Sequence, residues 1–199
     1  MSIKNLQPRF FVLLLFIIVA GVLRITAAGH ITPYSNFSPV GAMALFGGAY
    51  FADKWKSYVF PLLCIFLSDV IMNLTIYDAY VTGIMYDGWI WTYFGFAAMV
   101  LSGQLLIKKV RITNIVVASV VSAVAFWLLS DFGTWLSPVN IDMTTGTQFT
   151  KDFTGLVKCY IQGASTIKNT LLSNLVYSAI FFGLFELMQS KIPALSISK

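Results

Sequence analysis

The chain has few of the residues on which most metalloproteins and hydrolases rely. It contains one histidine, His30, and two cysteines, Cys64 and Cys159, which lie in or beside different apolar segments. It has no CxxC pair, no HExxH or GxSxG motif and no glycine-rich phosphate loop, so nothing predicts a zinc site, a disulfide framework or a familiar hydrolase centre. We therefore expect no metal, no cofactor and no catalytic activity.

Charged residues are scarce as well. They make up 11% of the 199 residues, whereas 58% of the residues are apolar and the mean hydropathy is +0.80; soluble domains carry roughly a quarter of charged residues. This composition indicates an integral membrane protein with room for about six spans and none for an ATPase domain. The net charge of +5 comes from small basic groups at the ends of apolar runs. Topology signals are distributed in this way, so we expect no nucleic-acid partner.

Six apolar runs predict a single all-α domain that forms a six-helix transmembrane bundle. The runs cover residues 10–28, 37–51, 58–74, 89–107, 114–130 and 170–189. Basic residues precede the first run and follow the second, fourth and sixth: Lys4, Arg9, Lys54, Lys56, Lys108, Lys109, Arg111, Lys191 and Lys199. Because basic connections stay in the cytoplasm, both termini are predicted to be cytoplasmic, in a bacterial inner membrane.

Two of these runs allow a second interpretation. The first 28 residues have the basic start, the apolar core and the small residues of a signal peptide, although Arg24 interrupts the approach to the cleavage site. The second run has only about 15 residues and could form a re-entrant loop. A re-entrant loop would place the basic cluster at residues 108–111 outside, so the charge pattern favours a span.

The long connection between the fifth and sixth runs has a helical pattern of its own. Phe153, Leu156, Val157 and Tyr160 recur at the spacing of one helix face. We therefore predict a short amphipathic helix in this outer loop, lying at the membrane surface or capping the bundle.

Polar residues inside the predicted bundle gather in its outer half. A charge within hydrocarbon costs several kcal/mol unless it is paired or wetted, so this asymmetry predicts an outward-facing cavity that binds a small molecule. Arg24 could clamp an acidic ligand or simply pair with Asp69 or Asp131. The candidate ligand-binding residues are Arg24, Asn36, Ser38, Asp69, Asn73, Asp131, Cys159, Lys168 and Asn169.

The second run begins with polar residues and continues with glycines. Its predicted helix starts on the outer side, so Asn36 or Ser38 can cap an N-terminus that points into the cavity, and Pro39 suits the first turn. Ala44 and Gly48 have the small-xxx-small spacing that lets two helices approach closely. The glycine face serves packing, either inside the bundle or against a partner.

Several segments resemble a group of small, uncharacterised bacterial membrane proteins. They are NFSPVGAMALFGGAYF at residues 36–51, PLLCIFLSDVIM at 61–72, DFGTWL at 131–136, and GLVKCYIQ with KNTLLSNLVY at 155–177. That group is similar to the substrate-binding S subunits of energy-coupling-factor vitamin transporters. The resemblance implies six helices, cytoplasmic termini, an outward-facing vitamin pocket and a transmembrane coupling subunit with ATPases. Residues 10–28 lack the AxxxA docking motif of S subunits. A related vitamin B12 transporter binds cobalt through a cysteine, a role that Cys159 or Cys64 could share.

Three functions follow as hypotheses. The first is a membrane transporter subunit, like an S component, that captures a vitamin-like micronutrient in the outer cavity for uptake. The second is a membrane enzyme or redox protein that uses Cys159 with Asp69 or Asp131. The third is a non-catalytic assembly factor that docks through the glycine face of the second helix.

Overall fold

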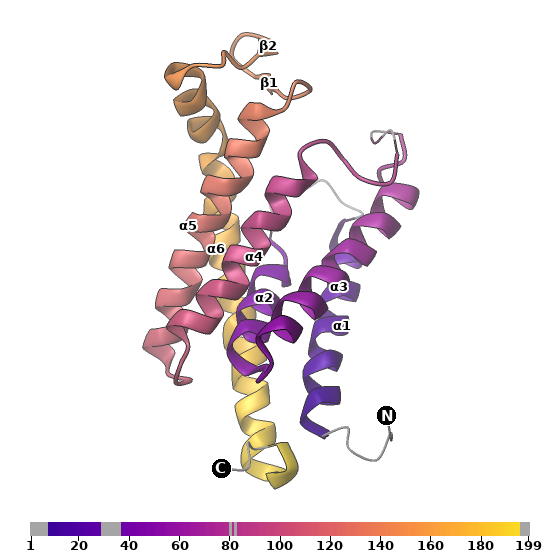
Figure 1. Ribbon diagram of the computed structural model, residues 1–199, viewed down its shortest axis with the longest axis vertical. Helices are drawn as coiled ribbons and strands as arrows, with labels where there is room; N and C mark the ends of the chain where they lie inside the picture. Colours follow the sequence, from indigo (N-terminus) through magenta and orange to yellow (C-terminus); the bar gives the residue numbers. More distant parts are fainter. Residues whose placement is uncertain (1–7, 29–36, 80, 82, 196–199) are drawn as a thin grey trace.

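A computed structural model describes residues 8–28, 37–79, 81 and 83–195. The described residues form six α-helices: α1 (Pro8–Ala28), α2 (Val40–Tyr50), α3 (Lys54–Thr75), α4 (Trp89–Leu106), α5 (Ile112–Leu136) and α6 (Phe153–Lys191). A short 3-10 helix, η2 (Pro193–Leu195), follows α6, and two paired strands, β1 (Ile141–Asp142) and β2 (Thr147–Gln148), lie between α5 and α6. The all-helical architecture predicted from the apolar runs is confirmed (Figure 1).

Every helix except α2 is long and apolar enough to cross a bilayer. A hydrocarbon core about 30 Å thick requires about 20 helical residues, and these five helices have segments of 18 to 39 residues. Their outer faces are apolar too. On α1, the side chains of Phe11, Leu15, Ile18 and Val22 are each more than half exposed. Such a surface suits lipid tails, and the chain is a multi-pass membrane protein.

The short helix α2 lies in the centre of the bundle. Its 11 residues make about 16 Å of helix, and it contacts each of the other five helices. All of its residues except Ala49 are buried. Protein therefore surrounds α2, which is why it can be built from glycine and alanine rather than from the large aliphatic residues of a lipid-facing span.

The glycines of α2 permit close contact with its neighbours. A Cβ atom added to Gly48 would overlap the backbone of α4 at Val100, and one added to Gly103 of α4 would overlap the backbone of α2 at Leu45. Gly47 lies in the same way against the ring of Pro61 in α3. Packing inside the chain is thus confirmed for this glycine face. The face is covered, so it offers no docking surface for an assembly factor.

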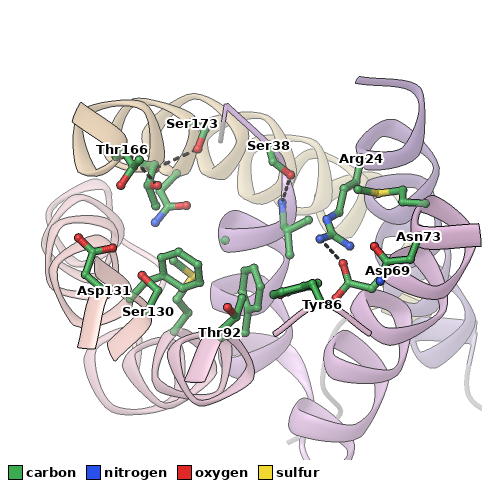
Figure 2. A pocket seen from close by; sticks show the side chains of 18 of the residues that line it. Arg24, Ser38, Asp69, Asn73, Tyr86, Thr92, Ser130, Asp131, Thr166 and Ser173 are labelled. Carbon is green, nitrogen blue, oxygen red and sulfur yellow. Dashed lines mark hydrogen bonds and ion pairs between the residues drawn. The ribbon is translucent and has the colours of Figure 1, made fainter. Parts of the chain in front are cut away.

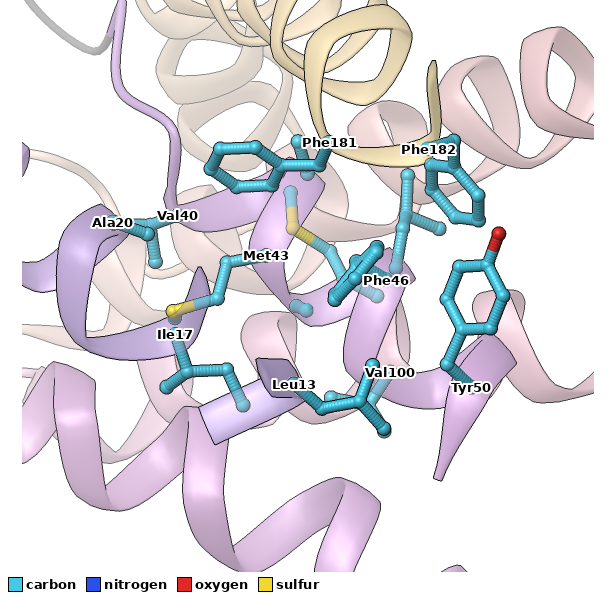
Figure 3. Close-up of a cluster of buried hydrophobic side chains, with 14 of the residues drawn as sticks. Leu13, Ile17, Ala20, Val40, Met43, Phe46, Tyr50, Val100, Phe181 and Phe182 are labelled. Carbon is cyan, nitrogen blue, oxygen red and sulfur yellow. The ribbon is translucent and has the colours of Figure 1, made fainter. Parts of the chain in front are cut away.

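An aromatic cluster joins α2 to α1 and α6. Phe46 of α2 is fully buried, and its ring stacks on Phe16 of α1 with centroids 5.1 Å apart. The ring of Phe185 in α6 meets Phe46 edge-to-face at 5.4 Å. Aliphatic and methionine side chains fill the space around these rings (Figure 3). This core packs α1, α2 and α6 against one another.

The start of α1 and the end of the described chain meet at one end of the bundle, which we call the termini end. There the guanidinium of Arg9 donates to the backbone oxygens of Leu195, at 2.7 Å, and of Tyr50, at 3.3 Å. The connections after α2 and α4 also lie at this end, since Gln104 of α4 donates to Ser57 of α3 (Figure 1). The basic residues at this end belong to the first turn of α3, the α4–α5 connection and the end of α6: Lys54, Lys56, Lys108, Lys109, Arg111 and Lys191. We call the opposite end the pocket end.

The structure corrects three predicted boundaries. The second run is helical over Val40–Tyr50 rather than over 37–51, and α5 continues to Leu136 instead of ending at residue 130. The amphipathic segment that begins at Phe153 is helical, but it forms the first turns of the 39-residue α6 rather than a separate helix. The polar stretch at 162–169 resembled a connection because its hydropathy falls. Polarity alone does not break a helix that also packs against α5.

Candidate functional site

A cavity of about 460 Å³ lies between α3, α4, α5 and α6, next to the start of α2 (Figure 2). This volume is within the range of about 300 to 1,000 Å³ that is usual for small-molecule sites. Polar and apolar side chains share its walls. Of the predicted ligand-binding residues, the cavity brings together Arg24, Ser38, Asp69, Asn73 and Asp131.

Arg24 and Asp69 form one polar group of the wall. Nη2 of Arg24 lies 2.5 Å from Oδ1 of Asp69, and Nη1 donates to the Ser68 hydroxyl at 2.5 Å. The hydroxyl of Tyr93 donates to the other carboxylate oxygen, Oδ2 of Asp69, at 2.8 Å. Both oxygens of Asp69 are therefore engaged. The partner of Arg24 is Asp69 and not Asp131, and the pair carries no net charge.

The connection between α3 and α4 forms the wall toward the pocket end. Asn73 donates to the backbone oxygen of Ile84 at 2.9 Å and so attaches this connection to α3. Val81 and Tyr86 line the cavity and also a second hollow of about 630 Å³, which lies beside Trp89 and Trp91 of α4. Burial, reinforced by the nearby Asp69 carboxylate, raises the pKa of Tyr86 to about 12. Its phenol therefore remains protonated at neutral pH and can donate a hydrogen bond.

Asp131 of α5 and Asn174 of α6 are two further polar residues of the cavity wall. Figure 2 shows Asp131 on the side of the cavity opposite the Arg24–Asp69 pair. Asp131 is 9% exposed, and its carboxylate lies so close to Gly163 that an added Cβ would overlap it. The side chains of Trp127 and Ser130 interact with this carboxyl group. However, no donor among the described residues meets Oδ2 of Asp131 with hydrogen-bond geometry, and the same holds for Oδ1 of Asn174.

The start of α2 opens into the cavity, as its polar beginning predicted. Val40 and Gly41 line the cavity, so the partial positive charge of this helix N-terminus faces it. The capping differs from the prediction. Pro39 occupies the N-cap position without a side-chain bond, and Ser38, one residue earlier, accepts from the Val40 N–H at 3.4 Å. Asn36, the other predicted cap, lies outside the described residues.

Three predicted ligand-binding residues lie away from the cavity. Cys159 is 2% exposed, and its thiol donates to the backbone oxygen of Asp131 at 3.4 Å. Lys168 is exposed and Asn169 is half-buried, and neither belongs to the lining. Helical periodicity explains the position of Lys168, which lies on the face of α6 opposite the cavity-lining residues Thr166, Thr170 and Ser173. Asn169 lies at the edge of the lining face and does not reach the cavity.

The cavity also contains residues that the sequence did not single out. The hydroxyl residues of α6 recur at positions 166, 170 and 173, a spacing that marks one helix face. A search for polar residues with this period would have found them. The aromatic lining residues Phe96 and Phe126 carry no such signal, because core aromatic residues look the same in sequence. Within the described part of the chain, no group of three metal-ligating side chains lies together, and His30 is outside that part.

Comparisons with known proteins assign no activity to the chain. Neither a curated protein nor a solved structure matches the chain. A family of unknown function (DUF6580) matches residues 4–195. Since this match covers nearly the whole sequence, the chain belongs to the DUF6580 family.

Proposed function

We propose that the chain is a membrane transporter subunit that binds a small, vitamin-like micronutrient in the cavity for uptake across a bacterial inner membrane. The observation that carries this proposal is the cavity itself, inside a bundle of membrane helices. Buried carboxylate and amide groups with unpartnered oxygens line it. A carboxylate within a membrane helix is costly, and such residues usually mark substrate pathways. Resemblance to the S subunits of energy-coupling-factor transporters supports the same function.

In this proposal the chain crosses the membrane six times, with both termini in the cytoplasm. The basic residues of the termini end support this orientation, because lysine and arginine favour cytoplasmic connections. The acidic residues Asp78 and Asp87 lie in the α3–α4 connection, at the opposite end. The cavity then opens outward. The chain makes its second crossing through α2, whose short length is tolerable because other helices shield it from lipid.

Energy for uptake would come from a partner. The sequence contains no phosphate-binding loop, so ATP hydrolysis would belong to a transmembrane coupling subunit with ATPases. Because α1 lacks the AxxxA motif, the chain would contact that subunit through a different surface. The enzyme hypothesis has less support, because the Cys159 thiol is directed at a backbone oxygen of α5 rather than into the cavity.

A ligand screen on purified protein tests the proposal. We expect one class within a panel of vitamins, corrinoids and nucleobase-like compounds to raise the melting temperature, because a ligand at 100 times its Kd stabilises a protein by about 2.7 kcal/mol. Ser130→Phe should abolish the shift by filling the cavity. Ser190→Phe is the matched control, since Ser190 is exposed and its hydroxyl, like that of Ser130, bonds the backbone oxygen three residues earlier. Absence of any shift, together with no copurifying ATPase, contradicts the proposal.

A further inference from the structure

The unpartnered polar atoms of the cavity are of one chemical kind. Oδ2 of Asp131 and Oδ1 of Asn174 have no hydrogen-bond partner in the described part of the chain. Both side chains line the cavity, with exposed fractions of 9% and 0%. Buried polar atoms are rarely left without a partner, because this costs about 1–3 kcal/mol per group. Both atoms are acceptors, and each packs on a glycine of a neighbouring helix, Oδ2 of Asp131 on Gly163 and Oδ1 of Asn174 on Gly41. A ligand in the cavity therefore meets the negative charge of Asp131 and a polar amide.

The hydroxyl group of Ser122 determines which way the Asn174 amide is oriented. The hydroxyl of Ser122 donates its proton to the backbone oxygen of Ser119, at 3.1 Å. Ser122 must therefore accept from Asn174, whose Nδ2 lies 3.2 Å away. The amide oxygen is left on the opposite side, against Gly41, where an added Cβ would overlap it. It is thus an acceptor, and it lies beside the start of α2 on the cavity wall.

The cavity lining carries an excess of negative charge. Its charged residues, among those the structure describes, are Arg24, Asp69 and Asp131. Arg24 and Asp69 neutralise each other at 2.5 Å, which leaves Asp131 without an ionic partner in the described chain. A cation entering this site gains a partner for a buried carboxylate, whereas an anion meets repulsion.

Aromatic rings supply the remaining contacts. Phe96 of α4 and Phe126 of α5 line the cavity together with Met99, and the two ring centroids are 4.8 Å apart. Aromatic faces attract cations as well as apolar groups, and desolvation strengthens this attraction. The same site can therefore hold the apolar body of a ligand and stabilise a positive charge on it.

We infer that the ligand is a small organic cation with N–H donors, such as an ammonium or amidinium group. Its charged group pairs with the Asp131 carboxylate, and its apolar part lies against Phe96 and Phe126. This inference rests on the proposed function, because it assigns the substrate class of the same cavity. It excludes ligands whose only charge is negative.

A series of matched probes tests the inference. The probes are phenethylamine, its N-trimethylated derivative, 2-phenylethanol and 3-phenylpropionate, each titrated against the purified protein with the melting temperature as readout. We expect the primary ammonium to bind most tightly, the trimethylated cation more weakly because it has no N–H donor, and the carboxylate not at all. Equal binding of the alcohol and the ammonium, or preferred binding of the carboxylate, overturns the inference.

Variants at the two acceptors extend the test. Asp131→Asn keeps the size of the side chain and removes its charge, so it should weaken ammonium binding by about 10- to 100-fold and leave binding of 2-phenylethanol unchanged. Asp53→Asn, at an exposed position of the termini end, is the control. If Asp131→Asn does not fold, Asn174→Asp provides a second variant that should strengthen ammonium binding by adding a carboxylate. Unchanged ammonium affinity in the folded variant contradicts the inference.

The two proposals fail in different ways. If a neutral or anionic compound from the vitamin panel binds the cavity and the ammonium probe does not, the cation inference is wrong while the proposed function stands. If neither the vitamin panel nor the probe series shifts the melting temperature, both are wrong.

Discussion

The guanidinium of Arg24 in α1 and the carboxylate of Asp69 in α3 form an ion pair in the cavity wall, with Nη2 and Oδ1 2.5 Å apart. Tyr93 of α4 donates to the same carboxylate at 2.8 Å, so the arrangement joins three helices. Both charges lie within apolar helices, where an unpaired charge is costly. The pair therefore stabilises the cavity wall whether or not a ligand also contacts Arg24.

Breaking this pair should destabilise the protein strongly. We expect Arg24→Leu or Asp69→Leu alone to cost about 3–5 kcal/mol, because each leaves one buried charge without its partner. The double variant should be more stable than either single variant. Lys56→Gln, which breaks an exposed pair with Asp53, serves as the control and should cost at most about 1 kcal/mol. Unfolding in mixed detergent micelles measures these differences, and additive effects of the two leucine replacements would contradict a direct pairing.

Close packing of α2 against α4 depends on two glycines. Gly48→Ala and Gly103→Ala should each destabilise the bundle by about 1–3 kcal/mol through overpacking, because an added Cβ overlaps the backbone of the facing helix. Gly183→Ala is the matched control, since nothing lies within 4 Å of the Cβ position at this glycine of α6. That control should be neutral or slightly stabilising. A melting temperature of Gly48→Ala equal to that of the control would refute the close approach of the two helices.

Replacing Cys159 should leave the function intact. The thiol is buried and bonded to the Asp131 backbone, so we expect Cys159→Ala to cost about 1 kcal/mol or somewhat more in stability through lost packing. The ligand-induced melting shift should be the same as in the unmodified protein. Cys64→Ala, which changes a half-buried thiol on α3, is the parallel control. Loss of the ligand response in Cys159→Ala alone would favour the enzyme or redox hypothesis instead.

Acid should loosen the first turn of α6 through Asp152. This carboxylate accepts from the backbone N–H of Gly155 at 2.8 Å; that bond, followed by one from Thr150, lowers the pKa of Asp152. A pKa below the unfolded-state value of about 4 means that the stabilisation is present above pH 4 and is lost as the pH falls through the folded-state pKa. The protection factors of the amides at residues 153–157, which are corrected for the intrinsic pH dependence of exchange, should therefore fall in acid. The fall should be smaller in Asp152→Asn, which keeps a neutral cap.

Much of the fold could be predicted from the sequence because a lipid bilayer imposes simple requirements on a helix that spans it. A span must be apolar for about 20 residues, and its basic ends indicate its direction. The ranges of α1, α3 and α4 were accordingly predicted to within a few residues at most ends. The end of α5 and the start of α6 were not, because the polar residues after position 130 and before position 170 continue helices that pack against each other. Hydropathy indicates whether a segment suits lipid or water, but it does not show which helices pack against that segment.

The candidate site was predicted in part, for a related physical reason. Arg24, Asp69 and Asp131 are expensive inside a membrane, so their presence alone indicated a pocket or a buried pair. Lys168 was predicted at the same depth but lies on the opposite face of α6, because depth along a helix does not specify rotation about its axis. The lining aromatic residue Phe126 looks in sequence like any other core residue.

Composition and the placement of charge thus establish, without any coordinates, that this is a multi-pass helical membrane protein whose intramembrane polar residues require partners. Which partners they find depends on how the helices rotate and approach one another. Folding pairs Arg24 with Asp69, places Asp131 across the cavity from them, and buries α2 in the centre through glycine contacts. These outcomes depend on side-chain packing between segments far apart in the chain, and local sequence patterns carry no record of that packing.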